Sequence, residues 1–267
     1  MAAGTARIAR DVLRGGRAHR YADHRWGVCE LHLPRGGGPH PVVAVMHGGS
    51  WSAGYDRRVM RPVCADLVRR GWAAWNIEYR RMGRGQGGGW PATFTDVAAA
   101  LDALPAVDAP LDLDRLVLLG HSAGGQLALW AAGRERLPER APGAAPLVRP
   151  RAVVAQAPVA DLERARSLTA PGGLVHRLLG GGPQDVPERY ELANPARQVP
   201  LRVPALLVHG EEDRTVSVGQ SRDYAAKARA AGAHVELVEP PGAVHRAHVD
   251  PRSAAWAAVT GRLGDLA

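Results

Sequence analysis

Gly120-His121-Ser122-Ala123-Gly124 decides the interpretation of this chain, because an apolar run leads into it and a helix-forming run follows it. Residues 116–119 read Leu-Val-Leu-Leu, as in a buried strand, and residues 126–130 read Gln-Leu-Ala-Leu-Trp, which favours a helix. A serine on a tight strand-to-helix turn holds its hydroxyl above the edge of the sheet, and glycines on either side leave room for the turn. The pattern predicts that Ser122 is a nucleophile. A chance match on a surface turn is disfavoured by the strand before it and the helix after it.

Donors for an oxyanion are expected at two places. The helix that follows Ser122 aims its first N–H groups and the positive end of its dipole at the same spot, so Ala123 N–H is the first candidate. His47-Gly48-Gly49-Ser50-Trp51 follows the apolar run 41–46 directly, and its glycines let backbone amides face a ligand. We expect Gly49 N–H and Ser50 N–H to be donors there. An ordinary Gly-rich turn is the alternative.

An acid is expected after a later strand. Residues 205–209 form an apolar run, and Gly210-Glu211-Glu212-Asp213 follows at its carboxyl end, where open α/β sheets gather functional groups. Asp213 is the predicted acid, because residues 214–216 lead into another element that would hold it in place. Glu211 and Glu212 are adjacent alternatives.

A base is expected last in chain order. His245 lies in a loop between the last predicted strand and the last predicted helix, which completes the order serine, acid, histidine. His248 is its competitor. Asp250-Pro251 has the pattern of a helix start, so His248 is expected just before that helix, at the surface.

Alternating apolar runs and helical patterns predict one α/β domain over residues 1–267, with a mostly parallel central sheet of about eight strands flanked by helices. Glycines and prolines interrupt the pattern over 158–204, which predicts a short helical cap insertion. Strands are expected at 26–33 (an edge strand), 41–46, 72–79, 115–119, 152–157, 205–209 and 234–238. Helices are expected at 57–70, 93–104, 123–133, 218–231 and 251–263.

Composition limits the partners. The 267 residues carry a net charge of +8, but the arginines are scattered among acidic residues with no dense basic block, so we expect neither nucleic acid nor a membrane surface as a partner. Residues 1–20 contain five arginines and no apolar core, and no apolar run is long enough to span a membrane, which predicts a cytoplasmic protein. Cys29 and Cys64 are expected to be buried free thiols, compatible with that compartment.

Two patterns that suggest cofactors are rejected. His245 and His248 could be metal ligands, but no H-E-x-x-H motif or cysteine cluster supports them. Residues 83–89 are Gly-rich without the Lys-Ser/Thr of a phosphate-binding loop, and we expect them to form a flexible pocket wall. The sequence therefore predicts no metal and no cofactor.

These motifs resemble the α/β-hydrolase superfamily, and more narrowly its HGG-type carboxylesterase and arylformamidase branch, over about residues 20–265. Residues 47–51 match the HGG-x-W oxyanion motif, 120–125 match the G-x-S-A-G-G elbow, and 78–80 resemble the Tyr-Arg step after the next strand. Residues 179–195 resemble a cap segment of bacterial carboxylesterase-like members, and Asp213 and His245 fall where the acid and base of the family lie. Ser50 replaces the third glycine of many lipase-type members, which argues against that subgroup.

The resemblance implies a serine hydrolase of small carboxylic esters that uses a Ser122-His245-Asp213 triad and an acyl-enzyme. An amide hydrolase of the arylformamidase type, or a small-peptide hydrolase, would keep the same triad. A non-catalytic binding protein on this fold is disfavoured, because every motif residue is present. Monomer and homodimer are both compatible. The candidates for the pocket are Trp51, Tyr79, Trp90 and His121, with a core position the alternative for the aromatic ones.

Overall fold

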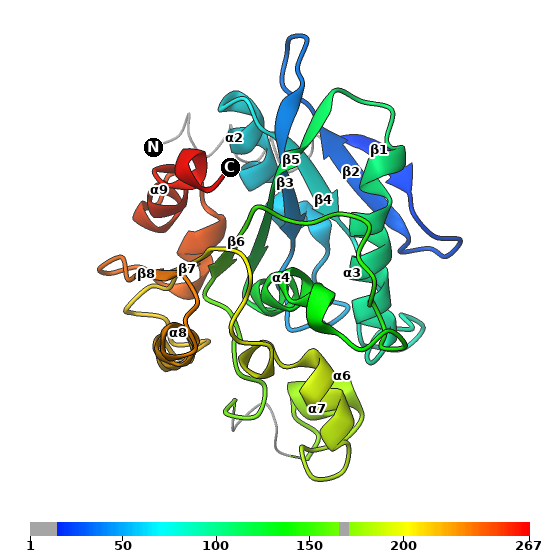
Figure 1. Ribbon diagram of the computed structural model, residues 1–267, viewed down its shortest axis with the longest axis vertical. Coiled ribbons are helices and arrows are strands. Elements are labelled where there is room, and N and C mark those ends of the chain that lie inside the picture. The colour runs from blue at the N-terminus through cyan, green and yellow to red at the C-terminus, as the bar shows by residue number, and fades with distance from the viewer. Residues whose placement is uncertain (1–14, 166–170) are drawn as a thin grey trace.

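The computed structural model describes residues 15–165 and 171–267, which form a sheet with helices on both faces (Figure 1). The sheet in these residues has eight strands in the order β1-β2-β4-β3-β5-β6-β7-β8. The strands from β4 to β8 pair in parallel, whereas β2 pairs antiparallel with both β1 and β4. The predicted mostly parallel sheet is therefore confirmed. Its strands are β1 (Arg17–Arg20), β2 (Val28–His32), β3 (His40–Met46), β4 (Ala73–Ile77), β5 (Leu111–His121), β6 (Ala152–Gln156), β7 (Ala205–Val208) and β8 (Val235–Val238).

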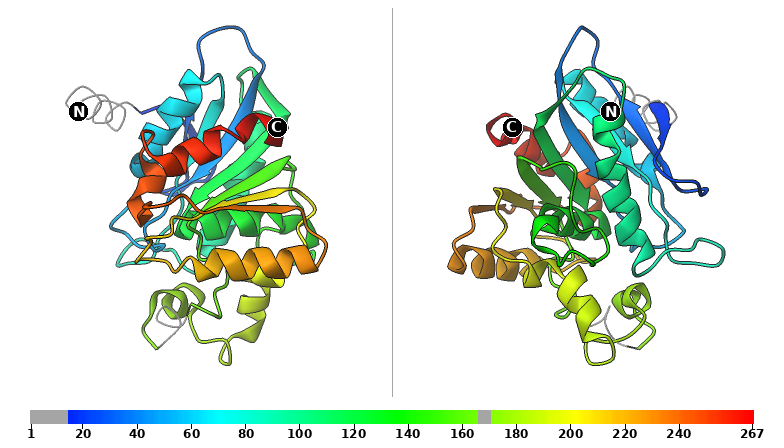
Figure 2. Two further views of the ribbon diagram at one scale, coloured as in Figure 1. Left: turned by 90° about the vertical axis from the view of Figure 1, so that its left-hand side faces the viewer. Right: turned by 45° about the vertical axis from the view of Figure 1, so that its right-hand side comes forward.

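The helices bury the sheet between two layers, which Figure 2 shows from the side. Side chains of β3 alternate between them: Val43 and Val45 pack on the layer of α2 and α9, and Val42 and Met46 on the layer of α3, α4 and α8. Both faces being covered explains why the parallel strands read as continuous apolar runs. The helices are α2 (Arg61–Arg69), α3 (Ala92–Asp102), α4 (Ala123–Ala132), α8 (Gly219–Ala230) and α9 (Ala254–Thr260), with short 3-10 turns η1 (Arg57–Met60), η2 (Leu104–Ala106), η3 (Arg134–Arg136), η5 (His245–Val249) and η6 (Leu263–Leu266).

The edge assignment of one strand and the start of the last helix are wrong. Strand β2 is not at the edge, because β1 pairs with it on its outer side; the short, exposed sequence of β1 has no apolar alternation that could announce a strand. The last helix begins at Ala254 and not at Pro251. Ser253 is its N-cap, and its hydroxyl accepts from the backbone N–H of Trp256 at 3.0 Å.

The insertion over 158–204 contains the predicted short helices α6 (Leu174–Leu179) and α7 (Pro187–Ala193), followed by η4 (Pro195–Arg197). Residues 166–170 of it lie outside the described residues. Figure 1 shows α6 and α7 together beyond α4. Gln126 and Trp130 of α4 donate side-chain hydrogen bonds to the carbonyls of Ala193 and Leu192, each at 3.0 Å. The insertion is therefore anchored to the helix that begins after Ser122; its role as a cap stays a prediction.

Three smaller predictions have separate outcomes. Cys29 and Cys64 are buried free thiols, as predicted. Within the described ranges, no helix has the length and apolar character needed to cross a membrane. Most of the Arg-rich stretch 1–20, on which the prediction of no export signal was based, lies outside the described residues.

Candidate active site

Ser122 occupies a strained turn between β5 and α4. Its backbone has φ +57° and ψ −120°, a combination that costs about 1–3 kcal/mol and persists only where surrounding packing enforces it. That packing comes from α4, all of whose residues are buried. A Cβ on Gly120 would lie 2.0 Å from the carbonyl oxygen of Gly124, and one on Gly124 would lie 2.2 Å from that of Met46. Both glycines are thus sterically required at this turn, as the sequence predicted.

The HGG loop, residues 47–51, lies directly beside this serine. A Cβ on Gly48 would be 3.1 Å from Cβ of Ser122. Gly49, Ser50 and Trp51 follow with φ of +113°, +56° and +53°, so the loop adopts a backbone that side chains rarely allow. Among the described residues no acceptor takes the N–H of Gly49 or Ser50. Ala123 is the first residue of α4, where N–H groups have no partner within the helix. The three predicted donors are therefore available to a ligand.

Buried side chains hold the HGG loop in place. Trp51 donates from Nε1 to Oε1 of Gln126 at 3.1 Å, and its carbonyl accepts from Met82 N–H at 2.6 Å. Tyr79 donates its hydroxyl proton to the carbonyl of His47 at 2.7 Å. Trp51 is 1% exposed and Tyr79 is fully buried. Their rings lie in the core and fix the loop, which is the alternative to a pocket wall that the sequence left open for both aromatic residues.

His245 and Asp213 contact each other across the sheet edge. Nδ1 of His245 donates to Oδ2 of Asp213 at 2.6 Å. The base and the acid that the sequence paired are thus brought together. The hydroxyl of Ser122, which is in a residue 7% exposed, makes no hydrogen bond to any residue in 15–165 or 171–267, so the structure does not join the serine to His245.

The Asp213 carboxylate is held by several donors. Its Oδ1 accepts from the N–H groups of Thr215 at 2.8 Å and Val216 at 2.9 Å. Burial raises the pKa of this carboxyl, but hydrogen bonds from His209, His245 and Val216 outweigh burial and hold the pKa well below its ordinary value. Asp213 is therefore a fixed anion. Glu211 and Glu212, the alternatives, are exposed.

His248 is not at the surface, contrary to the prediction. It is 0% exposed and its ring faces His121 and His209. Its Nε2 accepts from Gly210 N–H at 3.3 Å. Burial, followed by the neighbouring histidines His209 and His245, lowers its pKa to about 3, so the ring is neutral. The position of His248 behind the acid loop makes it a buried packing residue.

The last two predicted pocket residues contact different parts of the chain. Nε2 of His121 donates to the carbonyl of His245 at 3.0 Å, and burial together with nearby histidines lowers its pKa well below the ordinary value. His121 thus ties the end of β5 to the segment that begins at His245. The ring of Trp90 is half-buried and meets Phe94 edge-on, and the backbone N–H of Trp90 donates to the carbonyl of Leu178 in α6 at 2.7 Å. That the Gly-rich residues 83–89 line a pocket stays a prediction.

Sequence reasoning missed two residues of this site. His209, at the end of β7, lies with Nε2 3.3 Å from Oδ2 of Asp213, the same oxygen that His245 contacts. Glu78, which follows β4, is fully buried 3.0 Å from Nε2 of His47. Each is an ionisable residue at the carboxyl end of an apolar run, which is a signal the sequence does carry. The described residues include no group of three or more His, Cys, Asp or Glu side chains that could hold a metal ion.

Known proteins resemble this chain in both sequence and fold. Esterase LipQ of Mycobacterium tuberculosis is 32% identical over 214 residues, which cover 77% of this chain and 50% of the relative. A phosphonate-inhibited esterase B from Lactobacillus rhamnosis superposes with a TM-score of 0.79 at 21% identity, covering 99% of this chain and 92% of that one. Butyrate-bound esterase Est2 of Thermogutta terrifontis gives a TM-score of 0.72 at 21% identity, covering 94% and 92%. The chain thus has the α/β-hydrolase fold.

The chain spans about half the length of the curated relatives that it matches first. The family model for BD-FAE matches residues 29–228, a region that contains the HGG loop, Ser122 and Asp213 and ends before His245. With the strained serine turn, the HGG loop and the acid loop all inside that match, the chain belongs to the BD-FAE family.

Proposed function

We propose that this protein is a serine esterase that cleaves small carboxylic esters through an acyl-enzyme. The observation that carries the proposal is the strained Ser122 turn beside a loop with free amide donors, together with a His245–Asp213 pair whose backbone is tied to His121, the residue before the serine. The names of the relatives favour esters over amides, since LipQ and LipM are described as an esterase and a probable carboxylic ester hydrolase.

In the proposed reaction, Oγ of Ser122 attacks the ester carbonyl carbon while Nε2 of His245 takes its proton. Asp213 keeps Nδ1–H of His245 oriented and stabilises the imidazolium that forms. The oxyanion accepts hydrogen bonds from N–H of Gly49, Ser50 and Ala123. The tetrahedral intermediate collapses, and the leaving alcohol receives the proton from His245. A water molecule, deprotonated by His245, then attacks the acyl-enzyme, and His245 returns this proton to Oγ of Ser122 as the carboxylic acid is released.

The gap between Ser122 and His245 closes in this proposal when substrate binds, since catalytic hydrogen bonds are often long in enzymes without ligand. The insertion over 158–204 would act as a small cap, supported by its anchoring to α4 and by the Trp90–Leu178 hydrogen bond. Buried free thiols suit a reducing compartment, and a cytoplasmic location stays a prediction, as does the choice between monomer and homodimer.

The test is hydrolysis of short-chain aryl esters beside N-formylkynurenine by the wild type and Ser122→Ala under identical conditions. We expect ester turnover by the wild type and only background with the alanine variant. Faster cleavage of N-formylkynurenine would make the protein an arylformamidase-type enzyme instead. If the wild type cleaves neither, or Ser122→Ala matches it, the protein is not a serine hydrolase of this kind, and ligand binding becomes the leading function.

A further inference from the structure

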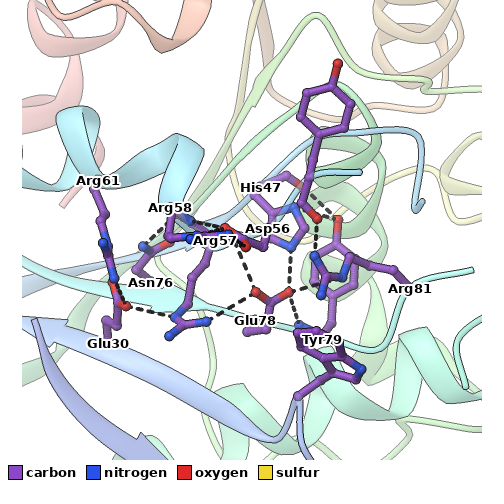
Figure 3. A network of polar contacts seen from close by, with 12 residues as sticks. Glu30, His47, Asp56, Arg57, Arg58, Arg61, Asn76, Glu78, Tyr79 and Arg81 are labelled. Carbon is purple, nitrogen blue, oxygen red and sulfur yellow. Dashed lines mark hydrogen bonds and ion pairs between the residues drawn. The ribbon is translucent and has the colours of Figure 1, made fainter. Parts of the chain in front are cut away.

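The His47 ring meets hydrogen-bond acceptors at both of its nitrogen atoms. Nε2 lies 3.0 Å from Oε1 of Glu78, and Nδ1 lies 2.7 Å from the carbonyl oxygen of Gly48 (Figure 3). His47 is 1% exposed and Glu78 is fully buried, so solvent does not compete for these contacts. Each nitrogen can satisfy its acceptor only by carrying a hydrogen.

Glu78 is ionised and therefore cannot supply the proton of this contact itself. Its oxygens lie 3.3 Å from Nη1 of Arg57 and 3.6 Å from Nε of Arg81, and these two guanidinium charges favour the carboxylate whatever the state of His47. Oε2 also accepts from the backbone N–H of Arg57 at 3.2 Å. An ionised carboxylate only accepts, so Nε2 of His47 has to donate.

Tyr79 also presents an acceptor, and not a donor, to Nδ1 of His47. Its ring stacks on His47 with centroids 4.2 Å apart and planes 3° apart. The hydroxyl proton of Tyr79 goes to the His47 carbonyl at 2.7 Å, so toward Nδ1, 3.4 Å away, that oxygen can only accept. Both oxygen atoms near Nδ1, the Gly48 carbonyl and the Tyr79 hydroxyl, thus act as acceptors, so we infer that Nδ1 carries a hydrogen.

We propose that His47 is a buried imidazolium, held by Glu78, that positions the HGG loop and places a positive charge behind the amides of Gly49 and Ser50. This inference rests on the proposed function, because it assigns that charge to stabilising the oxyanion. His47 does not touch the substrate, so it is a positioning residue. In a low-dielectric interior a fixed charge close to the reacting centre acts more strongly than it would in water.

Glu78 is the counter-charge that contacts the His47 ring, and it belongs to a larger cluster of charged side chains. Figure 3 shows the cluster extending from the HGG loop toward α2 and β2. Glu30 pairs with Arg57 at 2.9 Å and with Arg61, and Arg57 also reaches Glu78 at 3.3 Å. Asp56 and Arg58 pair with each other at 2.7 Å. With His47 protonated, the cations of the cluster exceed its carboxylates, so the field behind the loop is positive. The cations are His47, Arg57, Arg58, Arg61 and Arg81; the carboxylates are Glu30, Asp56 and Glu78.

The first test reads the charge on the ring of the wild-type protein. Long-range nitrogen–proton NMR of a sample with ¹⁵N-labelled histidine, with the His47 signals assigned by their loss in His47→Gln, distinguishes the two ring states at about pH 8, where a free imidazole is mostly neutral. We expect two protonated nitrogens for His47. One bare nitrogen would overturn the proposal. This measurement needs no catalysis, so it gives its result even if the proposed esterase activity is absent.

The second test measures whether the charge on His47 contributes to stabilising the oxyanion during catalysis. Glu78→Gln keeps an oxygen acceptor for Nε2 but removes the counter-charge, and we expect kcat to fall by about tenfold or more with KM changed by less than about threefold. Glu30→Gln is the matched control: it perturbs the same cluster through Arg57 without contacting His47, and should keep near-wild-type kcat. An unchanged kcat in Glu78→Gln, or an equal loss in Glu30→Gln, would overturn the electrostatic role. Loss of all ester cleavage in the wild type would instead refute the proposed function.

Discussion

His245 donates to Asp213 across 2.6 Å, although 32 positions separate them in the chain. The contact exists because β7 and β8 are adjacent parallel strands whose carboxyl ends open into neighbouring loops. Asp213 comes from the loop after β7 and His245 from the loop after β8. Sheet topology, not sequence proximity, therefore joins the acid to the base.

Asp213→Asn should lower kcat for aryl esters by about 10³–10⁴-fold with the fold intact. The asparagine fills the same volume, and its oxygen can still accept from the N–H groups of Thr215 and Val216. Its amide would face His245 and favour the wrong tautomer. Steady-state kinetics measures the loss, and circular dichroism checks the fold. Glu212→Gln, in the exposed part of the same loop, serves as the control and should behave as wild type. Equal losses in the two variants would argue that Asp213 has no special role.

Gly124→Ala should prevent the elbow from forming. The added Cβ would lie 2.2 Å from the Met46 carbonyl oxygen, which is backbone and cannot move aside cheaply. We expect a loss of about 3 kcal/mol or more in the free energy of unfolding, together with loss of activity. Chemical denaturation measures the first effect.

Gly37→Ala is the matched control for the elbow glycine, because nothing lies within 4 Å of its added Cβ. Its free energy of unfolding should change by less than about 0.5 kcal/mol, as expected at a surface site. A Gly124→Ala protein as stable as Gly37→Ala would show that the turn is not as tightly packed as described.

The buried histidines make stability fall on acidification. The pKa of His248 is lowered to about 3 in the fold, first by burial, whereas the unfolded chain protonates this ring below about pH 6.5. The unfolded state thus binds more protons between these values, and stability present above pH 6.5 is lost as the pH falls. His121, whose pKa is also lowered, acts in the same direction. For His248 alone the expected loss between pH 7 and pH 5 is about 2 kcal/mol.

His248→Gln tests this pH dependence, since its amide oxygen can still accept from Gly210 N–H and the side chain does not titrate. Denaturation at pH 7 and at pH 5 should show a smaller difference than in the wild type, by about 2 kcal/mol. Tyr224→Phe, at another buried site, should leave the difference unchanged. The choice of pH 5 keeps the contribution of Asp213 and other carboxylates with lowered pKa out of the comparison. An identical pH dependence in His248→Gln and the wild type would contradict the prediction.

Periodicity and turn chemistry were sufficient for the main sheet. Strands such as β3 and β6 are apolar throughout because helices cover both faces, so their sequences stand out. Strand β1 does not stand out, because it is four residues long and mostly exposed, and its place in the sheet comes from pairing with β2. An exposed edge strand lacks the apolar alternation by which a strand is identified in a sequence, which is why β2 was predicted as the edge strand.

The sequence predicted those residues of the candidate site whose type is required by the local backbone geometry. The glycines around Ser122 are needed for steric reasons, so the motif reveals the turn. The burial of Trp51, Tyr79 and His248 depends on which elements pack together, and residue type alone does not determine that. Glu78 and His209 were missed for a related reason. Their partners lie 31 and 4 positions away, and only the fold shows that these side chains face His47 and Asp213.

His209 yields the last prediction. Its Nε2 faces two acceptors, Oδ2 of Asp213 at 3.3 Å and the carbonyl of Val216 at 2.9 Å, so Nε2 carries the hydrogen. Nδ1 lies 2.8 Å from the hydroxyl of Ser221. The ring contacts the Asp213 carboxylate through Nε2, at the same oxygen that His245 contacts.

His209→Phe removes this donor while keeping a buried ring, and we expect kcat to fall by about tenfold because Asp213 loses one of the contacts that orient it. Ser221→Ala removes only the hydroxyl on the far side of the ring and should retain most of the activity. The kcat of the two variants is compared at saturating aryl ester. This comparison distinguishes a role for Nε2–H of His209 from a general need for packing in this region. If Ser221→Ala loses as much as His209→Phe, packing alone accounts for the effect; if His209→Phe keeps full kcat, Asp213 is held well enough by its backbone donors and His245.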